Sequence, residues 1–405
     1  MGNKTSDYPD DTMDELDQLI GLMTKRMGKN YTDANYNLES PSDSFFLSSM
    51  FFLNITAKYA NEDKGTRSIR VVVKRPPLLA VIRDMWKSDK QFHNEILFYE
   101  KFAVGHEDLP ICYYSHENPP VKSVLVLENI EERGYHLSSW RYNVPMDYTI
   151  AAIQENARFH AKGYAMREHR RAEFLDFVGN MEETRFDDDL NGLLPVVNGA
   201  ATRSVDCLRK QGHEKDFCDK LFAYLDDMFN AMMKCAEPEE PLATLCHGDF
   251  TLNNTFFKEE NGKVKAMFID FALMRYGSPV IDLSCYLSLH CAEELDKDML
   301  ESVLKAYNDS LIPCLKENNV DNLERFSYEA LCDDYKKNGL FGYAIASFFL
   351  STVMGKCELT PEDMADMTPA EKAHLARTLG GEEVDEILAK LLLNLMEFGC
   401  LADLV

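Results

Sequence analysis

The sequence predicts an α+β fold with two unequal parts, a small part rich in β-strands followed by a larger, mainly helical part. Its 405 residues exceed a typical single domain of roughly 100 to 200 residues. Segments rich in β-branched and aromatic residues are concentrated in the first third, and amphipathic helical patterns fill most of the remainder. The hydrophobic content of 45% and the charged content of 27% are typical of a globular protein.

The small part is expected to hold one N-terminal helix, an antiparallel sheet and one further helix. Residues 12–28 carry apolar side chains at helical spacing. Strand patterns occur at 45–59, 67–74, 109–116 and 121–130. The first two flank the turn sequence Asn61-Glu62-Asp63-Lys64-Gly65 and predict a hairpin, and a helix is expected from about Ser88 to Phe102. Because the last strand ends near Ile130, we predict domains at 1–130 and 131–405.

The second domain is expected to be mostly α-helical. Helical patterns cover 148–165, 299–315, 327–354 and 383–397. The most apolar run, residues 339–354, is too short and too rich in hydroxyl groups for a transmembrane span, so we predict a buried helix there. No transmembrane segment is expected.

Charge and cysteine content restrict the partners and the compartment. The chain has 43 Lys and Arg against 68 Asp and Glu, a formal charge of -25 that repels nucleic acids and anionic lipid surfaces. A nucleotide substrate would therefore need a local site with metal ions. Eleven cysteines without any C-x-x-C pair favour free thiols in a reducing compartment, so a cytoplasmic location is expected.

The N-terminus has no apolar signal core, but it does fit a short lipidation pattern. Met1 and Gly2 begin the M-G-x-x-x-[ST] pattern for N-myristoylation. Such a short pattern also arises by chance. A single acyl chain binds membranes only marginally and no basic patch lies beside it, so we expect at most weak membrane association, and only if Gly2 is acylated.

Three polar residues are brought together by a predicted hairpin. The run from Asn254 to Asp270 contains two apolar-alternating segments joined by "EENG", a strong hairpin signal. The hairpin therefore places Asn254 beside Asp270, with Asp249 on the loop just before them. Amide and carboxylate oxygens suit Mg²⁺, and the position of Asp249 suits accepting a proton from a substrate hydroxyl. Taken singly, Asp249 and Asp282 could also be helix caps or turn residues.

A second polar pair is expected in the first domain. Glu95 interrupts the apolar stripe formed by Phe92, Ile96 and Tyr99. Because an unpaired buried charge is costly, Lys74 on the neighbouring strand is the expected partner. The alternative is that Glu95 lies at the edge of the stripe and faces water.

The segments "CHGDFTLNN" (246–254) and "FIDFALMRYGSPVIDL" (268–283) resemble the catalytic loop and metal motif of the aminoglycoside phosphotransferase and choline kinase superfamily. More closely, they resemble the ecdysteroid kinase-like (EcKinase, CHK-type) family. The resemblance extends from roughly Ser42 to Phe349. It implies a bilobal protein-kinase-like fold that uses ATP and Mg²⁺ to phosphorylate hydroxyl groups of small molecules.

The resemblance also implies a role for each matching residue. Asp249 would be the catalytic base, Asn254 and Asp270 the Mg²⁺ ligands, and His247 and Asp282 structural supports of the loop. Lys74, paired with Glu95, would contact the α and β phosphates of ATP. The remaining implied nucleotide contacts are Ser42, Ser44 and Phe45 in "SPSDSFFLSS", and Leu127, Glu128 and Asn129 in "LVLENI".

Some features depart from the family pattern or stay open. The phosphate-covering segment "SPSDSFFLSS" lacks glycine, and Thr251 and Ala272 stand where relatives commonly have Trp and Gln. "LVLENI" either contacts adenine through its backbone or is simply an edge strand. His160 is expected to be a hydrogen-bonded core histidine, since no carboxylate or cysteine has compatible spacing. The aromatic residues Trp140, Tyr142 and Tyr148 either line an acceptor pocket or fill the core.

The leading hypothesis is an ATP- and Mg²⁺-dependent kinase acting on a hydroxyl of a lipophilic acceptor. The resemblance suggests an ecdysteroid or a xenobiotic alcohol or phenol. The alternatives are a choline or ethanolamine kinase and a catalytically silent, nucleotide-binding pseudokinase. A protein kinase is disfavoured because only eleven residues separate Asp270 from Asp282, too few for a long activation segment.

Overall fold

The computed structural model describes residues 10–26, 31–39, 48–59, 65–186, 193–357, 363 and 367–402. The chain divides into an N-terminal unit, Met1–Tyr135, and a C-terminal unit, His136–Val405. The N-terminal unit contains the large β-sheet, and the C-terminal unit is mainly helical. The predicted α+β class is confirmed.

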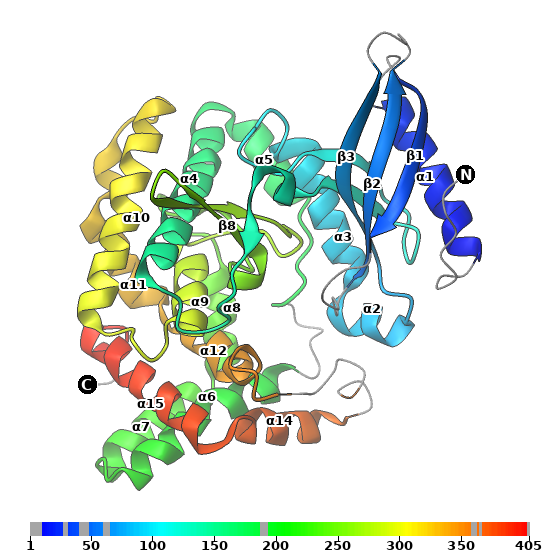
Figure 1. The fold of residues 1–405 in the computed structure, drawn as a ribbon. Helices are drawn as coiled ribbons and strands as arrows, with labels where there is room; N and C mark the ends of the chain where they lie inside the picture. Colours follow the sequence, from blue (N-terminus) through cyan, green and yellow to red (C-terminus); the bar gives the residue numbers. More distant parts are fainter. Residues whose placement is uncertain are drawn as a thin grey trace. The chain divides into compact units, whose positions relative to one another are not determined.

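The N-terminal unit is built on a five-stranded antiparallel sheet with the strand order β1-β2-β3-β5-β4. Figure 1 labels the strands β1, β2 and β3 of this sheet. The strands are β1 Tyr31–Glu39, β2 Ser49–Tyr59, β3 Thr66–Arg75, β4 Cys112–His116 and β5 Val124–Glu128. The predicted pairing of β2 with β3 is confirmed, with Ser49 opposite Arg75 and Lys58 opposite Thr66. Strand β1 was not predicted, because its polar sequence hides an alternation in which Tyr36 is buried while Asn35 and Asn37 are exposed.

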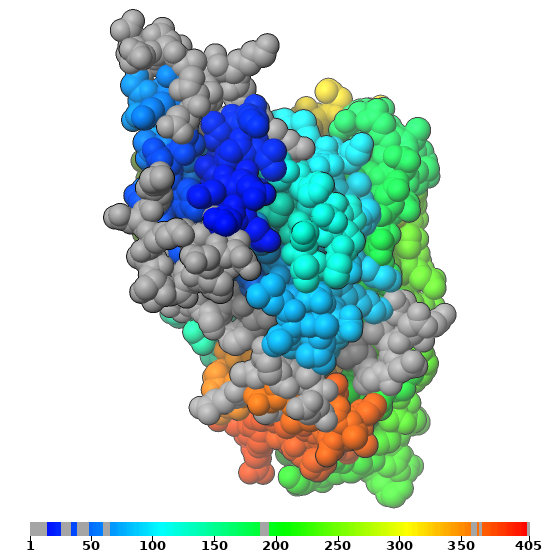
Figure 2. All heavy atoms as spheres, turned by 90° about the vertical axis from the view of Figure 1, so that its right-hand side faces the viewer, coloured from blue at the N-terminus to red at the C-terminus, as the bar shows by residue number. Residues whose placement is uncertain are grey.

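Helix α1, Asp10–Arg26, covers one face of this sheet and confirms the predicted first helix. The core beneath it contains four residues of α1 and the inward-facing residues of the strands: Leu16, Leu19, Ile20, Met23, Tyr36, Leu53, Ile55, Ile69, Val71, Val73, Val124 and Val126. The opposite side of α1 is exposed and forms part of the surface in Figure 2. Burial of apolar side chains at roughly 25 cal/mol per Å² is what holds the helix on the sheet.

Two short helices follow β3. These are α2, Ala80–Trp86, and α3, Ser88–Leu97, which continues into a π-helical turn, Phe98–Phe102. The predicted helix from Ser88 to Phe102 is therefore confirmed, with a changed hydrogen-bond pattern in its last turn. Because side chains alternate along a strand, Lys74 points to the sheet face opposite Val73, and it meets α3 there.

The strands of the C-terminal unit are short and serve mainly to place loops. Strands β6 His136–Leu137, β8 Thr255–Glu260 and β9 Lys263–Phe268 form one sheet, and β7 Thr244–Cys246 pairs with β10 Arg275–Gly277. The predicted hairpin between Asn254 and Asp270 is confirmed. Its turn residues Asn261 and Gly262 have φ angles of 54° and 71°, the left-handed pair that a tight hairpin turn requires.

Helices make up the rest of the C-terminal unit (Figure 1). They are α4 Met146–His169, α5 Arg171–Gly179, α6 Leu193–Lys210, α7 Lys215–Leu225, α8 Met228–Ala236, α9 Val280–His290, α10 Lys297–Glu317, α11 Tyr328–Asn338, α12 Leu340–Val353, α14 Pro369–Thr378 and α15 Gly381–Phe398. Helix α4 packs on β7, β9 and α10. The single helix predicted over 327–354 is instead two helices that meet at Gly339, a residue that weakens helix continuity.

The apolar run that forms α12 is a buried helix, as predicted. It packs against α9, α6 and α15. Across the described ranges, no helix is both long enough and apolar enough to cross a membrane.

The crossing of α12 over α9 depends on the absence of a side chain at Gly342. A Cβ atom there would lie 2.0 Å from the carbonyl oxygen of Ser284 in α9. We expect Gly342→Ala to lower the free energy of unfolding by about 3 kcal/mol, because backbone must move to remove the overlap. Chemical denaturation measures this change. Gly21→Ala is the matched control, since Gly21 is also helical but has no atom within 4 Å of the added carbon, and an equal loss in both variants would contradict the prediction.

Candidate active site

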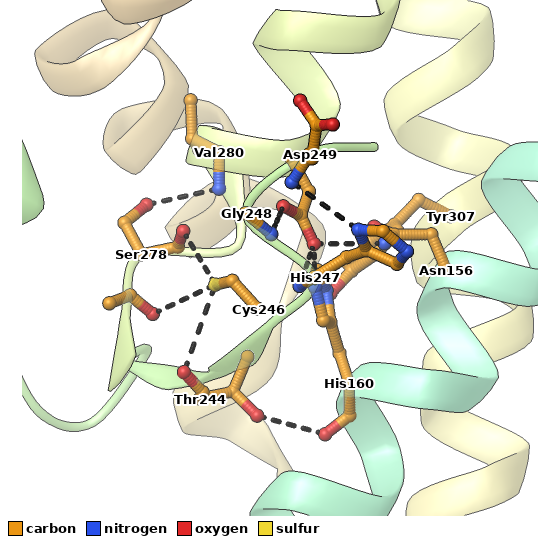
Figure 3. A network of polar contacts seen from close by, with 12 residues as sticks. Asn156, His160, Thr244, Cys246, His247, Gly248, Asp249, Ser278, Val280 and Tyr307 are labelled. Atoms are coloured by element: carbon orange, nitrogen blue, oxygen red, sulfur yellow. Dashed lines mark hydrogen bonds and ion pairs between the residues drawn. The ribbon is translucent and has the colours of Figure 1, made fainter. Parts of the chain in front are cut away.

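The centre of the candidate site is the buried carboxylate of Asp282 in α9. It accepts hydrogen bonds from the backbone N–H groups of His247 (2.8 Å) and Gly248 (2.9 Å). From α4 it accepts further bonds from Asn156 Nδ2 (3.1 Å) and His160 Nε2 (3.0 Å). Figure 3 shows this network. Asp282 therefore holds the loop that follows β7 by hydrogen bonds, in the arrangement the sequence suggested.

The charge of Asp282 is stabilised where it is buried. Burial alone would raise its pKa, but the interactions with His160 and His247 and the N–H of Gly248 outweigh burial and lower the pKa below its ordinary value. The stability that Asp282 contributes is therefore present above its ordinary pKa. It is lost as the pH falls through the lower pKa of the folded protein.

His160 is a hydrogen-bonded core histidine, as expected. Because a carboxylate only accepts hydrogen bonds, its Nε2 donates to Asp282, while its Nδ1 lies 2.7 Å from the hydroxyl oxygen of Tyr307. The spacing in the sequence did not reveal its partners, because Asp282 and Cys246 are adjacent to His160 in space though distant in sequence. Potential ligand atoms of these three residues lie within 4.8 Å of one another, yet the Cys246 thiol donates to backbone carbonyls, so we interpret the group as a hydrogen-bond network.

The loop conformation requires glycine at position 248. Gly248 has a φ of 78°, and a Cβ atom there would lie 1.7 Å from the carbonyl oxygen of Leu273. The residue before it, His247, also contacts the hairpin, because its Nε2 lies 2.9 Å from the carbonyl oxygen of Ile269. Its Nδ1 accepts the N–H of Asp249 at 3.3 Å, so the ring braces the loop against the end of the hairpin.

The carboxylate of Asp249 points away from this network (Figure 3). One oxygen, Oδ2, accepts a hydrogen bond from Asn254 Nδ2 at 2.9 Å. The other, Oδ1, accepts one from Arg185 Nη2 at 2.9 Å. Each carboxylate oxygen can accept more than one hydrogen bond, so the group is oriented at both oxygens and can still accept a proton.

Asn254 and Asp270 lie at the open end of the β8-β9 hairpin. The N–H of Ile269 donates to the carbonyl oxygen of Asn254 at 3.0 Å, which brings the two chain ends together immediately before Asp270. Asp270 has a φ of 64°, a left-handed conformation that few residues other than glycine adopt and that often marks a functional site. Because the amide nitrogen of Asn254 is used by Asp249, its amide oxygen is the atom suited to a metal. This oxygen and the Asp270 carboxylate fit the ligand preference of Mg²⁺.

Arg185 belongs to the site and was not predicted from the sequence. Its guanidinium contacts the carbonyl oxygen of Gly248 through Nη1 (3.1 Å) and the Asp249 carboxylate through Nη2. The residue lies in the segment after α5, and 64 positions separate it from Asp249. No periodicity or motif in that segment indicates a catalytic partner.

His290 at the end of α9 connects the loop after β7 to the segment before α4. Its Nε2 accepts the N–H of Leu252 at 3.1 Å, and its Nδ1 lies 3.1 Å from the carbonyl oxygen of Arg141. Burial lowers the pKa of His290 to about 4, so the ring is neutral, as the hydrogen bond from Leu252 requires.

The sequence left two roles open for the aromatic residues of this region, an acceptor pocket or the core. Trp140 is 41% exposed and is therefore not part of the core, and its ring contacts Tyr148 edge to face.

In the N-terminal unit, Lys74 and Glu95 form an ion pair. Lys74 Nζ lies 2.7 Å from Glu95 Oε2, and both side chains are buried. The Lys74 ammonium also lies 6.0 Å from the ring centre of Phe92. The water-facing alternative for Glu95 is excluded, while the contact of Lys74 with nucleotide stays a prediction.

The other expected nucleotide contacts stay predictions. β5 lies between β3 and β4, so "LVLENI", which contains Leu127, is not an edge strand. The N–H of Glu128 donates to Ile111 O at 2.8 Å, and that of Asn129 donates to Arg70 O at 3.0 Å. Both donors are thus engaged within the unit, and an adenine contact would have to use other backbone groups. The predicted contacts Ser42, Ser44 and Phe45, like Gly2, lie outside the described residues.

Comparison with solved structures finds kinases at low similarity. A microcompartment-associated aminopropanol kinase is 12% identical over 94% of this chain and 98% of its own, with a TM-score of 0.45. A Plasmodium vivax ethanolamine kinase is 11% identical over 85% and 81%, with a TM-score of 0.40. The GDP and kanamycin complex of APH(2")-IIia is 13% identical over 92% and 98%, with a TM-score of 0.40. These values are too low to indicate a substrate.

No curated protein sequence matches the chain. The model of the ecdysteroid kinase-like family matches residues 44–320. The matched region includes Lys74, Glu95, the loop with Asp249, the hairpin and Asp282. Since this match covers more than half of the sequence, the chain belongs to the ecdysteroid kinase-like family.

Proposed function

We propose that the protein is a small-molecule kinase that transfers the γ-phosphate of ATP to a hydroxyl group of a lipophilic acceptor. The observation that carries this proposal is the arrangement around Asp249. A partly exposed carboxylate, oriented at both oxygens, stands beside the hairpin end that bears Asn254 and Asp270. Membership in the ecdysteroid kinase-like family supports the same reaction class.

In the proposed reaction, Asp249 accepts the proton of the acceptor hydroxyl. The hydroxyl oxygen forms a bond to the γ-phosphorus, and the bond from that phosphorus to the bridging oxygen breaks, so that ADP leaves with the electron pair. The hydrogen bonds to both Asp249 oxygens fix the plane of the carboxylate, which favours a single direction for proton transfer. The network around Asp282 keeps the loop from shifting during this step.

The net charge of -25 opposes the approach of a triphosphate, so the site needs local positive charge. Asn254 through its amide oxygen and Asp270 through its carboxylate would hold Mg²⁺. When bound, the ion would neutralise charge on the phosphates. Lys74, kept in place by Glu95, would contribute a cation for the α and β phosphates.

The proposed acceptor is an ecdysteroid or a xenobiotic alcohol or phenol. Support comes from the family match and from the exposed Trp140, which lies in a segment tied to the catalytic loop through His290. An aromatic side chain at the surface suits contact with an apolar ligand.

The proposal is tested by measuring Mg²⁺-dependent ADP release with a panel of steroid, phenolic and amino alcohols. The expected result is turnover with a steroid or phenolic acceptor and a product heavier by one phosphoryl group. Turnover confined to amino alcohols would point to a choline- or ethanolamine-type kinase. Tight ATP binding without turnover of any acceptor would replace the kinase by a silent nucleotide-binding protein.

Asp249→Asn should lower kcat by about 10²- to 10⁴-fold, because the amide cannot accept the hydroxyl proton. Binding of ATP, measured by calorimetry, should change by less than about threefold, because the side chain keeps its size. Asp333→Asn, at an exposed position in α11, is the matched control. A variant with near-normal kcat would remove Asp249 from the role of base.

Asp270→Ala should raise the Mg²⁺ concentration needed for half-maximal turnover by at least about tenfold, since it removes an anionic oxygen from the predicted metal site. Titration of activity with Mg²⁺ at saturating ATP measures the change. Circular dichroism should show an intact fold. An unchanged Mg²⁺ dependence would count against Asp270 as a ligand.

A further inference from the structure

We infer that Arg185 is a positioning residue of the phosphoryl-transfer site, which orients the Asp249 carboxylate and offsets its negative charge. This inference rests on the proposed kinase function and assigns a role to a residue that the catalytic motif does not contain. It deepens the mechanism, because a base beside a triphosphate needs both a fixed orientation and a nearby cation.

The contacts of Arg185 restrain two parts of the loop at once. One arm of its guanidinium, Nη1, donates to the backbone carbonyl of Gly248 at 3.1 Å, and the other, Nη2, donates to Asp249 Oδ1 at 2.9 Å. A planar guanidinium holding adjacent backbone and side-chain oxygens limits rotation of the carboxylate. Asn254 holds the second oxygen, so the carboxylate has a donor at each end.

Arg185 is itself held in place by its neighbour Glu183. One oxygen, Glu183 Oε1, accepts the N–H groups of Thr184 (2.9 Å), Arg185 (2.7 Å) and Phe186 (2.9 Å). The same carboxylate forms an ion pair with the buried Arg275, at 3.2 and 3.3 Å. The Arg275 guanidinium also lies 4.8 Å from the ring centre of Phe186.

The ion pair between Glu183 and Arg275 connects the turn that bears Arg185 to the strands that carry the catalytic loop. Arg275 lies in β10 opposite Cys246 in β7, and the loop with Asp249 begins directly after β7. Burial opposes ionisation of Glu183, but Arg275 and the N–H donors outweigh burial and lower its pKa. The turn that presents Arg185 is therefore supported by charged groups on the same scaffold as the base.

Charge also favours this role over a purely structural one. The Arg185 and Asp249 side chains are 23% and 30% exposed, so their interaction is less screened than that of a surface pair. An ionised Asp249 alone would repel the triphosphate, and Arg185 reduces that repulsion. A structural tie would affect folding, whereas a positioning residue affects kcat more than substrate binding.

The test compares Arg185→Ala, Arg185→Lys and the control Arg170→Ala, using an acceptor that the wild-type protein turns over. Arg170 makes an exposed ion pair with Glu173 and lies outside the site. We expect Arg185→Ala to lower kcat by about 10²-fold while the KM for ATP changes by less than about threefold. Arg185→Lys should recover part of kcat, because it restores the charge without the planar fork.

Added guanidinium ion at low millimolar concentration provides an independent readout. It should raise kcat of Arg185→Ala severalfold and leave the low kcat of Asp249→Asn unchanged, since only the first variant lacks a cation. Thermal unfolding should give similar midpoints for the wild type and all three arginine variants.

A wild-type kcat in Arg185→Ala would overturn the inference and leave the kinase function standing. So would a loss of activity that parallels a lowered unfolding midpoint and does not respond to guanidinium. Absence of turnover in the wild-type protein with every acceptor would overturn both the proposed function and the role of Arg185.

Discussion

The buried carboxylate of Asp282 is the group on which the candidate site depends. An ionised carboxylate without partners in the interior would cost several kcal/mol, so its position is stable only while donors surround it. Two of those donors are backbone N–H groups at His247 and Gly248, and two come from side chains of α4. The charge of Asp282 therefore fixes the loop against both α4 and α9. The direction in which Asp249 leaves that loop follows from this arrangement.

Further contacts around Asp282 restrain the backbone of the loop at other positions. Gly248 allows a close approach to Leu273 that any side chain would block, and the ring of His247 spans from the loop to Ile269. The neutral His290 accepts a hydrogen bond from the backbone N–H of Leu252 and so fixes a later position of the same loop. Because the backbone of the loop is held, Arg185 and Asn254 can orient the Asp249 carboxylate. Positioning of this kind is the main way in which a protein can accelerate phosphoryl transfer, because it contributes little covalent chemistry of its own.

The parts of the fold and site that depend on local sequence could be predicted. The Asn261-Gly262 turn determines the hairpin, and the apolar stripe interrupted by Glu95 correctly indicated a buried ion pair. The contacts that His160 and Arg185 make with distant segments could not be predicted. His160 and Asp282 are 122 positions apart, and Arg185 meets Asp249 only because a turn after α5 is anchored to β10. Neither contact leaves a spacing signal in the chain.

Each of the two units contains a cation that is paired with one carboxylate. In an acidic protein, a cation needed for phosphate chemistry must be kept at its place without being neutralised by the many surrounding carboxylates. In the N-terminal unit Lys74 Nζ lies 2.7 Å from the carboxylate of Glu95, and in the C-terminal unit Arg185 Nη2 lies 2.9 Å from the carboxylate of Asp249. For Lys74 that partner is buried and serves to hold the cation. For Arg185 the partner is the proposed base, so the cation holds the carboxylate. Under the proposed function, the first pair would prepare the binding of phosphate and the second would prepare the transfer of the proton, and these two roles call for different side chains.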